Sequence, residues 1–224
     1  MKLYCFFVRF HTKEDSLKKE FLGQLAKYID ITKTIHPKMD VFPGDPSVKL
    51  TTYRSQTGNY HKGSVISEIV LTTHTGTHID APSHLFDGAD TINSFPLKLM
   101  TGKAIIQDAN ADLDNVIKNL SQSEACLLIF KKMPAILEFP DLSPQDFVSI
   151  ENCGINIVGT DYISVDKVAG KDLPNHRGFL KSGIWILENL YLDNVENGEY
   201  KYIILPLKTS AGDGAPVRAI LIKE

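Results

Sequence analysis

Short runs of apolar and β-branched residues recur along most of the chain and are separated by polar turns, a pattern that is typical of β-strands. It predicts strands at residues 65–73, 104–106, 126–130, 155–158, 184–187, 202–205 and 217–222. Two segments between them predict helices, one at residues 113–120 and one that starts at the Ser143-Pro144 cap and ends near Gly154. Strands interleaved with short helices predict an α/β domain.

The first 27 residues have a pattern of their own. Apolar residues recur at four-residue steps from Leu17 to Ile29, which predicts an amphipathic helix. The apolar run at residues 3–8 is too short for a signal peptide and predicts a strand. We therefore expect an N-terminal extension of unknown role at residues 1–27 and a single domain at residues 28–224.

Size, charge and cysteine content limit the partners and the compartment. A length of 224 residues fits one domain with a sizeable core. The 24 Lys and Arg residues nearly balance the 27 Asp and Glu residues without a long basic run, which argues against nucleic acid as a partner. No apolar stretch is long enough to span a bilayer, and the three widely spaced cysteines fit a reducing compartment. We expect a cytoplasmic protein.

The histidines are concentrated in one place. Three of the seven lie between His74 and His84, with Asp80 among them. In an extended chain His78 and Asp80 point to the same face, and Gly76 allows a bend that brings His74 toward them. Two imidazoles and one carboxylate leave room for water, which is typical of a catalytic metal site, because structural zinc sites usually have four ligands and are rich in cysteine.

Two questions about this cluster stay open on spacing alone. Asp80 can bind a single ion or bridge two. His84 follows a rigid Ala-Pro-Ser turn, so it is either a further ligand or a neutral base beside the metal.

The string His74-x-Gly-Thr-His78-x-Asp80-Ala-Pro-x-His84 resembles the signature of the metal-dependent cyclase-like hydrolases, the family that includes bacterial kynurenine formamidase and isatin hydrolase. Further segments agree with this family in the same order, so that the resemblance runs from about residue 28 to the C-terminus. These segments are Asp30-Ile-Thr32, Pro43-Gly44-Asp45-Pro46, Gly159-Thr-Asp161, Ser164-Val-Asp166, His176-Arg177, Gly183-Ile184, Glu188-Asn-Leu190, Leu205-Pro-Leu-Lys208 and Gly212-Asp-Gly214-Ala-Pro216-Val-Arg218-Ala219.

The resemblance implies a site with two divalent ions per chain, Zn²⁺ or Mn²⁺. The residues that it assigns to the metals are His74, His78, Asp80, His176 and Glu188, with Asp80 touching both ions. It also implies a mixed β-sheet curved toward a barrel, in a swivelling β/β/α arrangement, and assembly as a homodimer or homotetramer. Without it, the residues around His176 predict only a loop, and Glu188 only a charged strand end.

The implied chemistry is the cleavage of a C–N amide bond in a small molecule. A divalent ion lowers the pKa of a bound water from 15.7 toward about 7, which supplies hydroxide at neutral pH. The resemblance makes His84 the general acid and base that moves the proton from this water to the departing amine. An imidazole suits this role because its ordinary pKa lies near neutral pH.

The substrate is less well defined than the metal site. The family usually has a tryptophan before the Pro-Gly-Asp turn, where this chain has Phe42, which offers a smaller aromatic face for stacking. After Phe130 the chain reads Lys-Lys-Met, where many relatives read Arg-Thr-Gly-Trp. We expect an arylformamide such as N-formylkynurenine, or a cyclic amide. A cyclase or dehydratase with the same metal centre, or a metal-binding module without catalysis, are the alternatives.

Overall fold

The computed structural model describes residues 26–54, 63–210 and 212–223. The expected strand at residues 3–8 and most of the expected N-terminal helix lie outside the described residues. The last residues of that helical pattern were wrongly predicted, because Lys27–Asp30 form strand β1 and pair antiparallel with the C-terminal strand β10. This pairing fixes an extended backbone where the periodicity indicated a helix.

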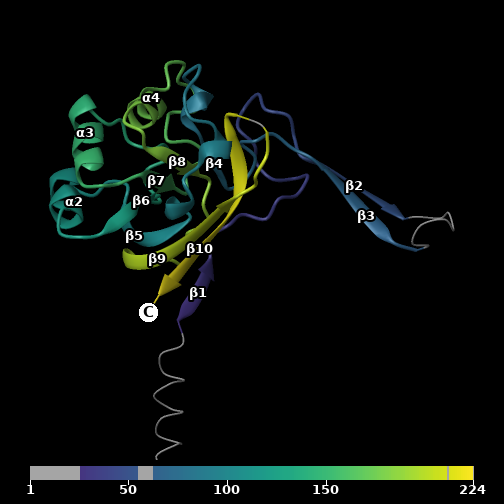
Figure 1. Cartoon of the computed structure of the whole chain (residues 1–224), viewed down its shortest axis with the longest axis horizontal. Coiled ribbons are helices and arrows are strands. Elements are labelled where there is room, and N and C mark those ends of the chain that lie inside the picture. Colours follow the sequence, from purple (N-terminus) through teal and green to yellow (C-terminus); the bar gives the residue numbers. More distant parts are fainter. Residues whose placement is uncertain (1–25, 55–62, 211, 224) are drawn as a thin grey trace, which may run out of the picture.

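Within the described part of the chain, seven strands close into a barrel in the order β10-β4-β8-β7-β6-β5-β9, and β9 pairs back to β10 (Figure 1). The strands are β4 (His78–Asp80), β5 (Thr101–Asp108), β6 (Ala125–Lys131), β7 (Ile157–Thr160), β8 (Trp185–Glu188), β9 (Gly198–Pro206) and β10 (Gly214–Lys223). Strands β5 to β8 run parallel to one another, whereas β4 and β9 are antiparallel to their neighbours. The expected mixed, curved sheet is thus confirmed.

Three helices cover one side of the barrel: α2 (Leu113–Leu120), α3 (Pro144–Asn152) and α4 (Pro174–Lys181) (Figure 1). The first two confirm the predicted helices, and Ser143 caps α3 in a capping box with Asp146. Helix α4 was missed, since its sequence is short and polar, although Pro174 occupies a favoured first-turn position. Among the described residues, no helix is both long and apolar enough to cross a membrane.

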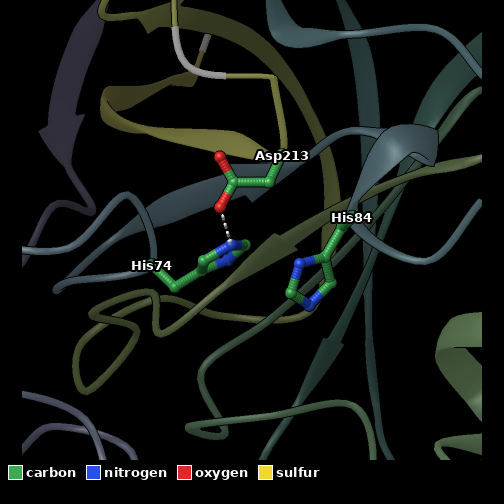
Figure 2. Close-up of side chains that lie close together, drawn as sticks. All are labelled: His74, His84 and Asp213. Carbon is green, nitrogen blue, oxygen red and sulfur yellow. Dashed lines mark hydrogen bonds and ion pairs between the residues drawn. The ribbon is translucent and has the colours of Figure 1, made fainter. Parts of the chain in front are cut away.

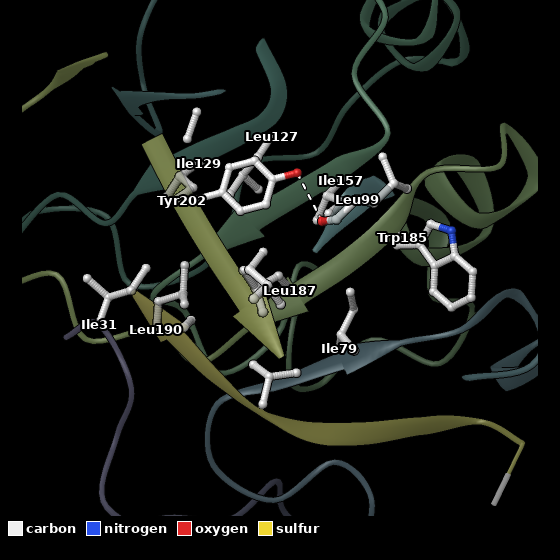
Figure 3. Close-up of a cluster of buried hydrophobic side chains, with 14 of the residues drawn as sticks. Ile31, Ile79, Leu99, Leu127, Ile129, Ile157, Trp185, Leu187, Leu190 and Tyr202 are labelled. Atoms are coloured by element: carbon white, nitrogen blue, oxygen red, sulfur yellow. Dashed lines mark hydrogen bonds between the residues drawn. The ribbon is translucent and has the colours of Figure 1, made fainter. Parts of the chain in front are cut away.

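Alternate residues of the central strands build two separate cores. Leu127 and Ile129 of β6 point into the barrel, where they meet Leu187 and Tyr202 (Figure 3). Leu128, between them in sequence, points outward and packs in the layer under the helices. The period-two alternation of side chains therefore explains why β6 is apolar on both faces.

Shorter elements connect these layers. Three 3₁₀ helices, η1 (Pro82–His84), η2 (Ile92–Ser94) and η3 (Leu97–Leu99), lie between β4 and β5. A separate hairpin of β2 (Lys49–Arg54) and β3 (Val65–Val70) extends away from the barrel (Figure 1). The strand expected at residues 65–73 is therefore present but ends at Val70, before the chain turns toward His74.

Candidate functional site

Two adjacent strands present three of the predicted site residues to one another. Strand β4 pairs antiparallel with β8 so that His78 lies opposite Glu188. Because side chains alternate along a strand, His78 and Asp80 share one face while Ile79 points into the barrel core. All three polar side chains are buried, and Asp80 is fully so. The expected convergence of residues two positions apart is what the structure shows.

A bend before β4 brings His74 to the same group. Gly76 has a φ of 68°, a left-handed conformation that glycine adopts at low cost, so the chain reverses between His74 and His78. The Nδ1 atom of His74 then lies 2.7 Å from Oδ1 of Asp80. The bend predicted at this glycine is thus present.

His176 reaches the group from helix α4, which packs against β8. Its Nδ1 lies 2.6 Å from Oδ2 of Asp166, which also accepts the backbone N–H of His176. Its Nε2 faces Oδ2 of Asp80 and Oε1 of Glu188, each at 3.4 Å. Asp166 was not identified as a site residue from the sequence, where it appeared only within a family-like segment. Its carboxylate fixes the orientation of the His176 ring.

His78 is oriented in the same manner. Its Nδ1 donates to the carbonyl of Gly76 at 2.9 Å, which leaves Nε2 toward Asp80 Oδ1 at 3.3 Å and Glu188 Oε2 at 3.5 Å. Both His78 and His176 therefore direct Nε2 at the same two carboxylates.

The donor set fits divalent cations. Among the described residues, two groups with Asp80 in common each bring their nitrogen and oxygen atoms within 4.8 Å of one another: His74, His78 and Asp80, and Asp80, His176 and Glu188. The Oδ2 atom of Asp80 is buried and has no hydrogen-bond partner. An unpaired buried carboxylate oxygen is costly unless a cation approaches it. Nitrogen and carboxylate donors without cysteine suit a catalytic ion.

The carboxylates control the protonation of the surrounding imidazoles. Burial alone would lower the pKa of His78, but Asp80 and Glu188 outweigh burial and raise that pKa to about 10. At His176 burial also acts to lower the pKa, but Glu188, Asp166 and Asp80 outweigh it and raise the pKa to about 11. Against its own burial, Asp80 has a pKa well below the ordinary value because of these histidines. Without a cation, the Nε2 atoms of His78 and His176 therefore carry protons.

His84 differs from the other histidines of the group. It ends the 3₁₀ helix η1, and its ring centroid lies 4.2 Å from that of His74 and 5.9 Å from that of His176. Burial lowers the pKa of His84 below its ordinary value of 6.5, and the two neighbouring imidazoles lower it further. His84 is therefore neutral at neutral pH.

Asp213 is a further acidic residue beside this group, and it was not identified as a site residue from the sequence. It lies between Gly212 and Gly214, where it appeared only within a family-like segment. Its Oδ2 accepts from the Thr73 hydroxyl at 2.7 Å and lies 3.1 Å from Nε2 of His74 (Figure 2). His74 is thus held at both ring nitrogens, by Asp80 on one side and by Asp213 on the other.

A cavity of about 200 Å³ opens onto these residues. The side chains of His84, His176 and Glu188 line it on one side. Phe42 and Leu173 supply apolar wall, so that the predicted substrate residue Phe42 does border the site. A small cavity with an apolar wall and convergent polar groups is typical of a pocket for a small organic molecule.

Comparisons with known proteins identify relatives of this chain. The model of the Cyclase family matches residues 29–128. A curated kynurenine formamidase from Salinibacter ruber is 38% identical over 205 residues, which cover 86% of this chain and 96% of the relative. A structure from Bacillus stearothermophilus, described as a "predicted metal-dependent hydrolase", has 28% identity and a TM-score of 0.69, covering 89% of this chain and all of the other.

The fold is also found in a more distant protein. Isatin hydrolase A from Labrenzia aggregata superimposes with a TM-score of 0.70 at 18% identity, covering 94% of this chain and 99% of that one. With a relative at 38% identity over nearly its full length, this chain belongs to the cyclase family of metal-dependent hydrolases.

Proposed function

We propose that the protein is a metal-dependent amidohydrolase that cleaves the C–N bond of a small arylformamide or cyclic amide. One observation carries this proposal: the buried Asp80 belongs to two groups of histidine and carboxylate ligands, and its Oδ2 atom has no hydrogen-bond partner. The curated relative from Salinibacter ruber is named a kynurenine formamidase, which makes N-formylkynurenine the first substrate to test.

Each group would hold one cation. His74, His78 and Asp80 would hold the first, and Asp80, His176 and Glu188 would hold the second. Zn²⁺ is the preferred ion and Mn²⁺ the alternative, since imidazole and carboxylate ligands suit both. When bound, such an ion lowers the pKa of a water molecule and polarises the carbonyl of the substrate.

His84 moves the proton. It lines the cavity and is neutral at neutral pH, so its free ring nitrogen accepts the proton of the attacking water as the C–O bond forms. The resulting imidazolium returns that proton to the nitrogen of the leaving amine as the C–N bond breaks. His84 thus takes up one proton and returns it within the same turnover.

The neighbouring residues keep the ligands in position. Asp166 holds His176 at Nδ1, and Asp213 holds His74 at Nε2. A carboxylate on the second nitrogen of a ligand histidine fixes the ring and raises its basicity. Phe42, in the cavity wall, stacks on the aromatic part of the substrate.

We also propose that the domain spans residues 28–224, that residues 1–27 are an extension to it, and that the protein is a cytoplasmic homodimer or homotetramer. The described cysteines Cys126 and Cys153 are free thiols, which supports a reducing compartment.

The experiment that tests the function combines elemental analysis with a hydrolysis panel. Purified protein is expected to contain about two divalent ions per chain and to hydrolyse N-formylkynurenine, another arylformamide or isatin. Chelation should abolish turnover, and Zn²⁺ or Mn²⁺ should restore it. Full turnover by metal-free protein would refute the proposal.

A further inference from the structure

Asn189 directly follows the proposed ligand Glu188 and lines the same cavity. Along an extended strand two consecutive side chains point to opposite faces, so that the second would enter the barrel core. Here Leu187 and Leu190 lie in that core, whereas Glu188 and Asn189 both border the cavity. Asn189 has a φ of 59°, and this left-handed conformation interrupts the alternation at the end of β8. The chain thus presents a second polar side chain beside Glu188.

The side chain of Asn189 stands at a position where glycine would cost less. A left-handed backbone is strained for residues with a Cβ atom, although asparagine tolerates it better than most. A glycine would make the same turn without that strain. Asn189 is also buried, with 5% of its surface accessible. Burying a carboxamide is costly unless its polar atoms find partners, so both ends of this amide need one.

The backbone of Asn189 is fixed by hydrogen bonds at both of its polar groups. Its N–H donates to the carbonyl of Tyr162 at 3.0 Å, and its carbonyl accepts the hydroxyl of Thr77 at 2.8 Å. The Oγ1 atom of Thr77 in turn accepts the backbone N–H of Lys33 at 2.9 Å. Thr77 is buried. One buried hydroxyl therefore connects the backbone of Lys33 to that of Asn189 and sets the geometry in which their side chains meet.

Lys33 determines which end of the Asn189 amide remains free. Its Nζ donates to Oδ1 of Asn189. Burial lowers the pKa of the Lys33 amine, and the carboxylates of Asp161 and Asp40 act against that lowering and favour the ammonium. An ammonium group has three N–H donors and no acceptor, so it can meet only the oxygen of a carboxamide. The two N–H donors on Nδ2 of Asn189 are thereby left over.

The Nδ2 atom of Asn189 is open to a ligand. Among the described residues, none accepts a hydrogen bond from it, and the one buried side-chain atom without a partner is Oδ2 of Asp80. An unpaired Nδ2 that is not in this class must be accessible. Lys33 borders a neighbouring cavity that shares Asn189 with the site cavity, but Lys33 does not border the site cavity itself. With Oδ1 turned to Lys33, the Nδ2 atom is the end available to the site.

We propose that Asn189 is a catalytic residue, whose Nδ2 donates a hydrogen bond to the carbonyl oxygen of the substrate, and that Lys33 is the positioning residue that holds the amide in this orientation. Negative charge develops on that oxygen as water attacks the carbonyl carbon, and a fixed N–H donor stabilises it without having to reorganise. The contact of the amide with a cation makes its N–H groups stronger donors. The inference rests on the proposed amide hydrolysis and adds to it a donor from the protein.

The kinetic test removes the amide without changing the backbone. Asn189→Gly suits the positive φ and should lower kcat for N-formylkynurenine about 100-fold, the cost of one such donor. KM should change by less than about threefold, because the contact strengthens only in the transition state. Metal content should stay at the level of the unmodified protein. Asn189→Asp, which keeps the shape and the contact with Lys33 but has no N–H donor, should lower kcat at least as much.

A double-mutant cycle tests the role of Lys33. Lys33→Met keeps the length of the side chain and removes its donors, so the amide of Asn189 is released and kcat should fall about tenfold. In the Asn189→Gly background the same change should have no further effect, because no amide is left to position. Lys38→Met, at an exposed lysine of the same segment that does not border the site cavity, is the matched control and should keep the kcat of the unmodified protein.

A spectroscopic measurement tests the contact without turnover. In Zn²⁺-loaded protein labelled with ¹⁵N at asparagine, the Nδ2 signals of Asn189 are those missing from the Asn189→Gly spectrum. Benzamide, a stable amide, should shift these signals, and should shift them less in Lys33→Met.

The possible outcomes separate this inference from the proposed function. Nδ2 signals that benzamide leaves unmoved, a kcat of Asn189→Gly within about threefold of the unmodified value, or loss of metal from that variant would each overturn the role of Asn189. An equal effect of Lys33→Met in both backgrounds would overturn the role of Lys33. Shifted Nδ2 signals in a protein that hydrolyses no amide of the panel would refute the hydrolytic function alone and confirm the contact of Asn189.

Discussion

Metal binding should release protons from His78 and His176, and the pKa values of the site histidines give the number of protons released. In metal-free protein these imidazoles have pKa values of about 10 and 11, and the pKa of His74 is also raised. At pH 6 the first two are fully protonated and the third mostly so. A ligand nitrogen must lose its proton when the cation binds. Asp80, with its lowered pKa, is already ionised and contributes none.

Titration of metal-free protein with Zn²⁺ at pH 6 is therefore expected to release about two to three protons per chain. At this pH a water molecule on the ion, with a pKa near 7, largely keeps its own proton, so the count reports the ligands. The affinity should rise about tenfold per pH unit for each proton displaced. This dependence should continue above neutral pH, because the two pKa values lie so high.

Isothermal titration calorimetry in buffers of different ionisation enthalpy measures the proton count directly. His176→Gln should reduce the number of protons released by about one, because the glutamine amide has no titratable proton that the metal displaces. The group around His74 is retained in this variant. Release of fewer than one proton by the unmodified protein would refute the reasoning, since it would mean that the imidazoles are not ligands or are already neutral.

Four further predictions follow from the same geometry. His84→Gln should lower kcat/KM by about 10² to 10⁴ while the metal content is kept, and the pH profile of the unmodified enzyme should fall on the acidic side with an apparent pKa below 6.5; an unchanged profile in the variant would exclude His84 as the base. Asp213→Asn should weaken the binding of the ion that His74 holds by about 10- to 100-fold and leave the other ion in place. Elemental analysis after partial chelation would measure this difference. Phe42→Ala should raise KM for aromatic formamides more than for aliphatic ones, and Phe42→Trp should restore or lower it; equal effects on both classes would contradict stacking. Folding raises the pKa of His78 and His176, so metal-free protein should have its full ion-pair stability below about pH 6.5 and lose it as the pH rises through about 10 and 11, which urea unfolding at several pH values would measure.

The sequence was most informative where one local pattern decides the structure. The alternation of His78 and Asp80 predicted their shared face, and Gly76 predicted the bend that brings His74 to them. The Ser143-Pro144 cap likewise located the start of α3. In each of these cases a backbone preference acts over a few residues and needs no tertiary contact.

Residues that depend on distant contacts could not be found in this way. His176 lies on a helix that periodicity did not indicate, and only the family resemblance connected it with Glu188. Asp166 and Asp213 reach the site through hydrogen bonds from loops that are far from the histidine cluster in sequence. The residues at 27–29 appeared helical because their role as a strand is set by pairing with β10 at the other end of the chain.

Strand β4 consists of His78, Ile79 and Asp80 alone, and it connects β8 to β10. It is therefore the narrowest link in the circumference of the barrel, and it carries two of the site residues. Without cations, the side chains around this link are joined by the ion pairs of His78 and His176 with Asp80 and Glu188, whose N–O distances are 3.3 to 3.5 Å. A bound ion would connect the site residues of β4 with Glu188 of β8. Metal loss should therefore first appear as faster hydrogen exchange at β4 and the facing start of β10, while the parallel strands β5 to β7 stay protected.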